Sequence, residues 1–515
     1  MKTLETEVLV IGASASGTAA AIQAARMGSR VVLVEEGPWV GGMLSSAGVS
    51  AIDGNHRLPA GLWGEFRAFV REYYGGADRV ETGWVSNTSF EPHVAARILE
   101  NLVTSEPRIS LFRGWWCNDV LTERNPGTGR RRITGAVFRD ATGASFHVDA
   151  TITILADEYG DALVSAGIPW RTGLEGRMAT GEAIGPEEPY ARPQDLTYVA
   201  TLAIPPRGFA GGIPAPIPPL DSEFAHILGP EPLSWDQFFD YGRLPNHLMM
   251  LNWPIGGNDY FGEYLKPDRR AAVVDAARDK TLRLVRFLQR TFGADRVRLC
   301  TVALIPYIRE ARRIYGMQTL ALSDLTAPEA SSVAAYGIAV GDYPLDHHRS
   351  EDPDAPALEF PAVHAFSVPY GCLVPHEFDG VLVAEKSISV TGIVNGCTRL
   401  QPVVMQIGQA AGAAAALCVS GSVEPRSLDV RALQAVLLAA RGYLAPTHDA
   451  TPDDAAFEAL QWAVVTGALS LRRSSEGWAN RAYVEPDGPS DCARFRTRRE
   501  YAIAQSQRPR EPLYL

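Results

Sequence analysis

Residues 8–35, VLVIGASASGTAAAIQAARMGSRVVLVE, decide the fold class of this 515-residue chain. The run 8–11 is short and apolar, as in a buried parallel strand, and residues 31–35 have the same character. Between them, a turn at 12–17 leads into a helix of small residues at 18–27. This order of strand, tight turn, helix and strand predicts a βαβ unit of a Rossmann-like α/β domain.

The turn Gly12-Ala-Ser14-Ala-Ser16-Gly17 is a variant of the G-x-G-x-x-G dinucleotide fingerprint. Gly12 permits the tight turn, Gly17 permits close packing of the helix, and the N–H groups at the helix start are expected to face a pyrophosphate. Ser14 replaces the middle glycine. Either the backbone therefore lies slightly farther from the pyrophosphate, or the Ser14 hydroxyl contacts a phosphate. Glu35 can accept hydrogen bonds from ribose hydroxyls and would repel a 2′-phosphate. These features predict a dinucleotide site and leave NAD and FAD both open.

Three later segments favour FAD. Residues 35–43 have the shape of a loop that follows the ribose-binding acid in glutathione-reductase-like flavoproteins, residues 156–161 look like a strand-to-helix crossing over the dinucleotide, and residues 381–391 resemble a second FAD motif whose acid binds the ribityl chain. Pro402 marks a helix N-terminus that could stabilise an anionic reduced ring. The further residues expected at the cofactor site are Glu36, Gly41, Gly42, Met43, Asp157, Gly160, Asp161, Glu385, Gln401, Pro402 and Val403.

Together these segments resemble the FAD-dependent oxidoreductase family, glutathione-reductase-like flavoproteins of bacteria whose members are often labelled putative xanthan lyases. The resemblance spans most of residues 5–445, and its more particular marks are the segments 154–167, 309–313, 341–347 and 368–375. There are two departures. Glu385 and Lys386 stand where relatives tend to have an A-G-R-like sequence, and Gly371 stands where arginine is common.

The resemblance implies a discontinuous FAD-binding domain of residues 1–165 and 361–420. We expect an inserted α+β substrate or cap domain over residues 166–360, because the proline-rich region 184–232 breaks the doubly wound pattern and an amphipathic helix follows near 268–292. Residues 421–515 are expected to form a C-terminal helical extension and an arginine-rich tail. The simplest interpretation of that tail is a solvated surface.

No second fingerprint indicates an NAD(P)H domain, so electrons are expected to come from a small-molecule substrate. We expect a C–OH or C–N bond to be dehydrogenated by hydride transfer to flavin N5, with O2 or another acceptor reoxidising the flavin. The candidate bases are His347, His348, His364 and His376, since histidine titrates near neutral pH. Arg399 could bind a substrate carboxylate or a flavin carbonyl.

Two alternatives belong to other classes. One is non-redox elimination on an acidic polysaccharide, which only the label of some relatives suggests. The other is an FAD-containing binding or assembly protein that docks through its tail.

The composition and net charge of the chain limit the classes of partner that it is expected to bind. The formal net charge of −11 disfavours nucleic acid and anionic membranes. The N-terminus is unlike a signal peptide, and the most apolar stretch, 410–419, is too short to span a bilayer, so a cytoplasmic protein is expected. The six cysteines form no CxxC pair, and no metal site is predicted. No motif sets the oligomeric state.

Overall fold

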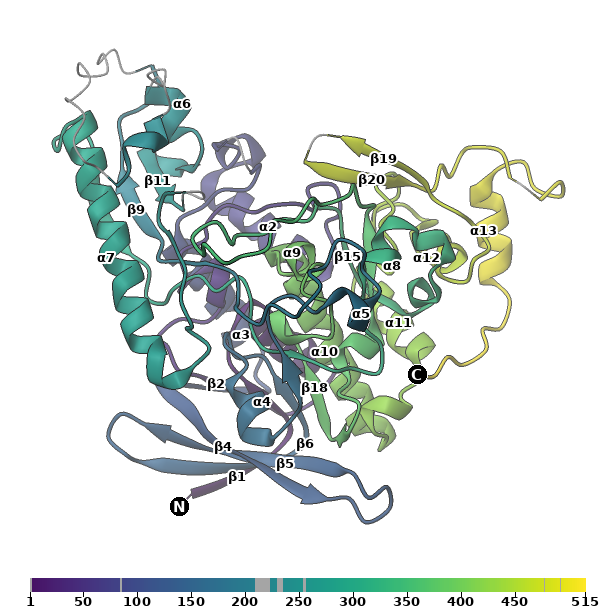
Figure 1. Ribbon diagram of the computed structural model, residues 1–515. Coiled ribbons are helices and arrows are strands. Elements are labelled where there is room, and N and C mark those ends of the chain that lie inside the picture. The colour runs from purple at the N-terminus through teal and green to yellow at the C-terminus, as the bar shows by residue number, and fades with distance from the viewer. Residues whose placement is uncertain are drawn as a thin grey trace.

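The computed structural model describes residues 2–83, 86–208, 223–228, 235–252, 256–476, 478–490 and 492–515. One eight-stranded sheet is formed by the strands of residues 2–155 and by two strands from residues 378–383 (Figure 1). Its main order is β17-β5-β6-β1-β2-β3, with β18 beside β6 and β4 beside β5. The strands are β1 (Lys2–Ile11), β2 (Val31–Glu35), β3 (Ile109–Arg113), β4 (Trp115–Arg124), β5 (Arg131–Asp140), β6 (Ser145–Leu155), β17 (Phe378–Asp379) and β18 (Val381–Val383).

The centre of this sheet is parallel, as the βαβ unit predicts. β1 pairs in parallel with β2 and β6. β18 also pairs in parallel with β6, although these two strands are more than 200 residues apart in the sequence. The predicted Rossmann-like fold and its discontinuity in sequence are therefore confirmed. The chain turns at Gly114, whose φ is +75°, from the parallel strand β3 into β4, which pairs antiparallel with β5.

Two helices pack closely against each other beside the sheet: α1 (Ala15–Arg26) and α10 (Gln401–Gly421). A Cβ at Gly408 would collide with the carbonyl oxygen of Ser16, and one at Gly412 with that of Ala20. Only glycine permits this approach of two backbones. The helices α2 (Gly61–Tyr74) and α3 (Pro92–Thr104) lie between β2 and β3 in the chain.

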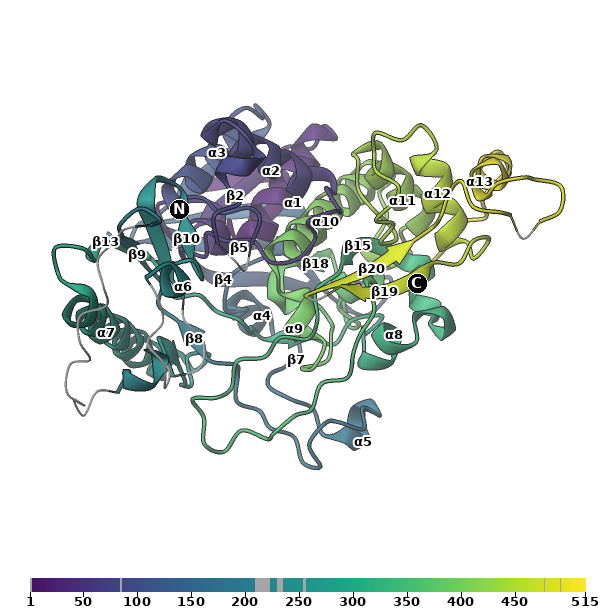
Figure 2. The ribbon, with the colours of Figure 1, turned by 90° about the horizontal axis from the view of Figure 1, so that it is seen from above.

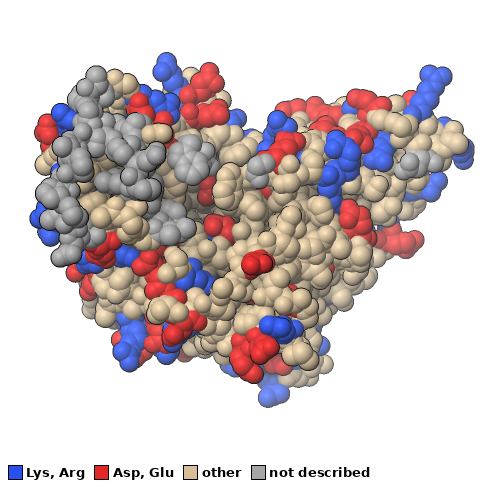
Figure 3. All heavy atoms as spheres, turned by 45° about the horizontal axis from the view of Figure 1, so that its top comes forward, with Lys and Arg blue, Asp and Glu red and all other residues tan. Residues whose placement is uncertain are grey.

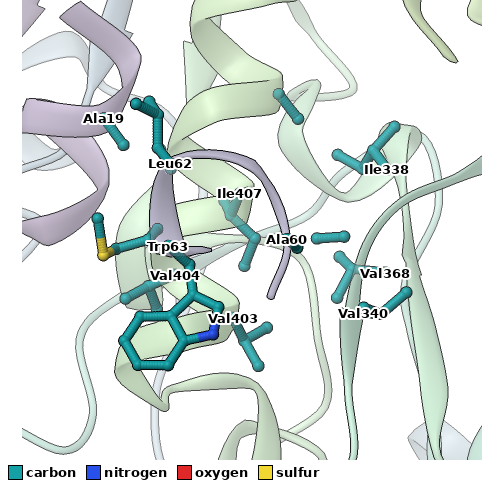
Figure 4. Close-up of a cluster of buried hydrophobic side chains, with 14 of the residues drawn as sticks. Ala19, Ala60, Leu62, Trp63, Ile338, Val340, Val368, Val403, Val404 and Ile407 are labelled. Carbon is teal, nitrogen blue, oxygen red and sulfur yellow. The ribbon is translucent and has the colours of Figure 1, made fainter. Parts of the chain in front are cut away.

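The helix α10 is the centre of the largest core. Its side chains Val403, Val404 and Ile407 lie between Leu62 and Trp63 of α2 on one side and the strand pair β15–β16 on the other (Figure 4). By length and composition α10 could cross a membrane, but 83% of its most apolar window is buried inside the fold. Its apolar surface is therefore already covered by protein.

The inserted region carries a second, antiparallel sheet of order β10-β11-β9-β13. The long helix α7 (Pro267–Phe292) packs on it through Leu284, Leu288 and Phe292. Residues 209–222 and 229–234 of the proline-rich region lie outside the described residues. The elements of this region are β7 (Trp170–Arg171), β8 (Leu196–Thr197), β9 (Ala200–Ala203), β10 (Arg243–Leu244), β11 (Leu248–Leu251), β12 (Asp259–Tyr260), β13 (Arg298–Val302), β14 (Arg313–Ile314), α5 (Arg177–Thr180), α6 (Trp235–Phe239) and α8 (Leu322–Thr326). The short helix α4 (Asp161–Ala166) precedes it.

The C-terminal part forms a lobe on the side of the molecule opposite α7 (Figure 2). Basic side chains gather on the projecting arm that carries α13 (Figure 3). The elements are β15 (Gly337–Gly341), β16 (Phe366–Pro369), α9 (Asn395–Thr398), α11 (Val430–Ala439), α12 (Phe457–Val465), β19 (Arg472–Glu476), β20 (Ala479–Tyr483) and α13 (Arg498–Ser506). The tail is more than a solvated surface, since Arg481 of β20 is buried and bonds Asp342 at 2.9 Å.

Candidate functional site

The glycine-rich turn between β1 and α1 has the geometry of a dinucleotide loop. Gly12 has a φ of +92°, and a Cβ there would lie 2.7 Å from the Cα of Asp157. A Cβ at Gly17 would collide with the carbonyl oxygen of Gly12. Ser14 caps the helix, because its Oγ accepts a hydrogen bond from the amide of Gly17 at 3.1 Å. Its hydroxyl is thus bonded to its own helix.

Glu35 stands at the end of β2, beside this turn. Its carboxylate accepts hydrogen bonds from the amides of Ala13 at 2.7 Å and Gly37 at 2.8 Å. Burial, with help from the nearby Glu158 and Asp157, raises the pKa of Glu35 to about 7 despite these bonds. Glu36, next along the chain, is exposed. A group of acidic side chains, with an elevated pKa at Glu35, therefore lies at this end of the site.

The Gly41-Gly42 loop folds over the turn. The amide of Gly41 donates to the carbonyl of Ala13 at 2.7 Å, and both glycines have positive φ. A Cβ at Gly42 would lie 2.9 Å from the Cα of Ser14 and would collide with Oε1 of Glu158. Met43, next in the loop, is buried. The space beside the loop is therefore filled by the Glu158 side chain.

A buried ion triad of Glu158, Lys386 and Glu385 lies at the N-terminus of α1. The Lys386 Nζ donates to Glu158 Oε2 at 2.6 Å and to Glu385 Oε1 at 2.8 Å. The other oxygen of Glu385, Oε2, accepts the amide of Ser16 at 3.0 Å. The amide of Glu385 donates in return to Ser16 Oγ at 3.0 Å. The segment 381–391 thus reaches α1. Binding of the ribityl chain by its acid stays a prediction.

The remaining cofactor candidates separate into two groups. Asp157 and Gly160 lie at the sheet edge, where burial raises the pKa of Asp157 to about 7. Asp161 instead bonds Arg270 of α7 and Arg312. Although burial opposes it, these guanidinium groups hold the pKa of Asp161 below its usual value. Asp161 therefore joins α4 to the inserted region.

A cavity of about 680 Å³ opens at the N-terminus of α10. Gln401 forms part of its floor, and its Nε2 donates to the carbonyl of Val49 at 3.2 Å. Other lining residues come from distant parts of the chain, namely Ala51, Asp53, His56, Tyr241, Tyr307, Arg309, Tyr343, Asp346, His347, His348 and Arg399, with Glu476, Trp478 and Arg481 of the β19–β20 hairpin and its turn.

A charged network forms one wall of this cavity. Arg399 bonds Asp346 at 2.7 Å, and Asp346 lies 3.4 Å from Nε2 of His348. The other ring nitrogen of His348 lies 2.6 Å from Asp259, which also pairs with Arg309 at 3.0 Å. Burial and Arg309 act to lower the pKa of His348, but Asp259 and Asp346 outweigh them and raise it. The two carboxylates therefore favour the protonated form of His348.

Asp53 also lines the cavity, and its pKa is shifted in the opposite direction to that of Asp346. Burial, reinforced by Asp346, raises the pKa of its carboxyl to about 7. Burial would also raise the pKa of Asp346, but His348 and Arg399 outweigh it and hold that pKa far below the usual value. Two carboxyls of one cavity therefore have separated pKa values, the arrangement that lets one exchange a proton near neutral pH while the other stays charged.

The four predicted bases do not come together. His347 and His348 line the cavity, but burial lowers the pKa of His347 to about 3, and its Nε2 donates to the carbonyl of Ile393 at 2.8 Å. His364 lies outside the cavity lining, and its amide bonds Leu325 at 2.9 Å. His376 lines a separate pocket of about 180 Å³. Arg399, directly before α10, lines the cavity, and its binding of a substrate carboxylate or a flavin carbonyl stays a prediction.

Sequence reasoning missed three contributors to the cavity. Asp53 ends the glycine- and serine-rich segment that follows Gly41, so an acid closing a cofactor loop was a usable signal. Trp478 is 69% exposed at the rim, and its ring stacks on Tyr343 with centroids 6.3 Å apart and planes at 19°. Nothing in the local sequence links these two aromatic residues, which are far apart along the chain.

One family model matches most of the chain. The family model described as FAD dependent oxidoreductase matches residues 7–437. No curated protein matches the chain. Among solved structures, a geranylgeranyl bacteriochlorophyll reductase-like protein of Thermoplasma acidophilum is 11% identical, with 90% of this chain and 87% of that chain covered and a TM-score of 0.39. A p-nitrophenol 4-monooxygenase of Pseudomonas putida is 11% identical, with 85% and 81% covered and a TM-score of 0.35. The myxobacterial chondrochloren halogenase is 10% identical, with 84% and 78% covered and a TM-score of 0.38.

Proposed function

This chain belongs to the FAD dependent oxidoreductase family, and from that premise we propose that it dehydrogenates a hydroxylated or amine-containing small molecule in the cavity at the N-terminus of α10. FAD is its cofactor, and its general role is flavin redox chemistry. The observation that carries the proposal is the pair Asp53 and Asp346, two carboxyls of one cavity with separated pKa values.

The residues fit FAD at its two ends. Gly12, Gly17 and Glu35 would hold the adenosine half, because the turn would leave no room for side chains and the acid ends β2. Gln401 and the start of α10 would hold the ring, where the helix N-terminus favours negative charge. Between these ends, the carboxylate of Glu385 accepts a hydrogen bond from the amide of Ser16. When bound, FAD supplies a two-electron acceptor for hydride.

Asp53 is the proposed proton acceptor. A carboxylate with a pKa of about 7 can remove an O–H or N–H proton at neutral pH while the adjacent carbon loses hydride. Asp346 stays ionised and holds Arg399 and His348 in place. Arg399, fully buried and bonded also to Tyr307 at 2.5 Å, orients any acidic or carbonyl group of the substrate. Trp478 and Tyr343 offer an aromatic surface for an apolar or sugar-ring face.

The test is anaerobic reduction of the FAD-loaded protein by a panel of alcohols, sugars and amines. Loss of the oxidised flavin absorbance with one class, followed by its return on adding O2 or another acceptor, supports the proposal. No loss across the panel, with FAD fully bound, contradicts it.

A second candidate is non-redox elimination on an acidic sugar. The observation that favours it is the cavity itself, which brings together Tyr241, Tyr343, His348, Arg309 and Arg399 from distant parts of the chain. Such groups could neutralise a uronate and remove its α-proton. An unsaturated product that forms while the flavin stays oxidised would support this function over dehydrogenation.

A further inference from the structure

The ion triad of Glu158, Lys386 and Glu385 lies where the dinucleotide loop would receive a phosphate. An α-helix presents unpaired amides and a partial positive charge at its N-terminus, and both favour an anion. In α1 the anion at the Ser16 amide is the carboxylate of Glu385, at 3.0 Å. An internal side chain thus occupies a position suited to a ligand.

Glu385 is held firmly in that position. Its φ of +58° is unusual for a residue with a side chain, so the surrounding contacts must stabilise the strained backbone. Its amide donates to Ser16 Oγ at 3.0 Å, and Ser16 Oγ donates to the carbonyl of Val404 at 2.6 Å. The strand β18, the turn and α10 are therefore tied together around this one carboxylate.

The positive charge of Lys386 is already matched by the two carboxylates that it contacts. Its side chain is fully buried and bonds both Glu158 and Glu385. Oε1 of Glu158 is buried and has no hydrogen-bond partner among the described residues. A pyrophosphate would add two negative charges to this acidic cluster, with no further buried cation in the triad to meet them.

We propose that Glu385, fixed by Lys386 and Ser16, is an internal anion that closes the pyrophosphate position of the FAD site, and that FAD binds by displacing it. The proposal rests on the family cofactor and is independent of the substrate and reaction proposed above. It makes the affinity for FAD, and not only turnover, a property set by Glu385.

The test measures the affinity of the FAD-free full-length protein for FAD by flavin fluorescence and for ADP by calorimetry. ADP has the adenosine and pyrophosphate of FAD without the flavin, so it isolates the position that Glu385 occupies. Glu385→Gly suits the positive φ and leaves Lys386 paired with Glu158, so no buried charge loses its only partner. We expect both ligands to bind at least about tenfold more tightly to this variant.

Glu182→Ala is the matched control. Glu182 is also buried and accepts the amide of Leu322, at the start of α8, at 2.9 Å, but it is no part of the triad. Its removal is expected to leave both affinities unchanged. Glu385→Gln, which keeps the shape and removes the charge, decides the matter if Glu385→Gly fails to fold.

Unchanged or weaker binding of FAD and ADP by folded Glu385 variants would overturn the proposal. Tighter FAD binding without tighter ADP binding would also overturn it, because the gain would then lie at the flavin end. Neither result bears on the substrate test, which uses protein saturated with FAD.

Discussion

The backbone amide of Ser16 donates a hydrogen bond to the carboxylate of Glu385 at 3.0 Å, although the two residues are 369 positions apart. This bond joins the first helix of the chain to the second predicted cofactor segment. It also explains why a glycine-rich fingerprint alone does not describe the site, since the group that meets the helix is supplied by the distant segment that follows β18.

The triad predicts a large stability loss when its cation is removed. Lys386→Met leaves Glu158 and Glu385 buried with no counter-charge, and we expect the free energy of unfolding to fall by about 3–5 kcal/mol. Urea denaturation measures it. Lys266→Met, which removes an exposed pair with Glu263, is expected to cost less than about 1 kcal/mol. Equal effects of the two substitutions would contradict the role of Lys386 as the counter-charge of Glu158 and Glu385.

The acid cluster predicts that the FAD-free protein is more stable in mild acid. Burial raises the pKa values of Glu35 and Asp157 to about 7, so the folded state binds more protons than the unfolded state between about pH 4 and 7. The free energy of unfolding should therefore fall as pH rises through this window and level off above it. Urea denaturation at pH 5 and pH 8 checks the sign, and Glu35→Gln should reduce the fall by about 2 kcal/mol. A stability that rises with pH would refute it.

Asp53 predicts the pH profile of turnover. Because it must lose its proton to act as a base, kcat/KM should rise as pH passes through about 7. Asp53→Asn should lower kcat/KM by roughly 10²–10⁴-fold and remove that rise. Steady-state rates from pH 5.5 to 8.5 with a substrate found in the panel measure both. Asp78→Asn, at an exposed position, should change neither, and a wild-type profile in Asp53→Asn would rule out this role.

The aromatic rim predicts an effect on binding rather than on the chemical step. Trp478→Ala removes a ring that stacks on Tyr343, so KM should rise by roughly 2–10-fold with kcat little changed. The side chain is 69% exposed, so stability should be kept. Trp116→Ala, on β4 away from the cavity lining, is the control. An unchanged KM would show that the substrate does not reach the rim.

The contact between α1 and α10 predicts a position-specific glycine requirement. Gly408→Ala places a methyl group against the Ser16 carbonyl and should destabilise the fold by about 1–3 kcal/mol. Gly421→Ala, on the same helix, meets nothing closer than 3.6 Å, at Val423, and should be neutral or slightly stabilising. Thermal denaturation of the two variants tests this, and equal melting temperatures would count against the close approach.

Local pattern was sufficient for the βαβ unit. The alternation of an apolar run, a glycine turn and a small-residue helix depends on neighbouring residues alone, and it placed β2 at 31–35 and α1 within three residues of its observed ends. The helices α2 and α3, the position of α10 and the return of residues 381–383 to the first sheet could be predicted in the same way. The assignment of catalytic roles to His347, His348, His364 and Arg399 remains a prediction.

The sequence by itself determined the Rossmann-like class, the dinucleotide turn and the segments that return to it, because these depend on periodicity and on glycine at fixed offsets. Only the tertiary structure decided which charges meet. The separated pKa values of Asp53 and Asp346, the raised pKa of His348 and the closure of the α1 N-terminus by Glu385 arise from burial and from partners that are mostly distant in the sequence. Electrostatic energy depends on distance in space and on desolvation, and neither is written in the order of the residues.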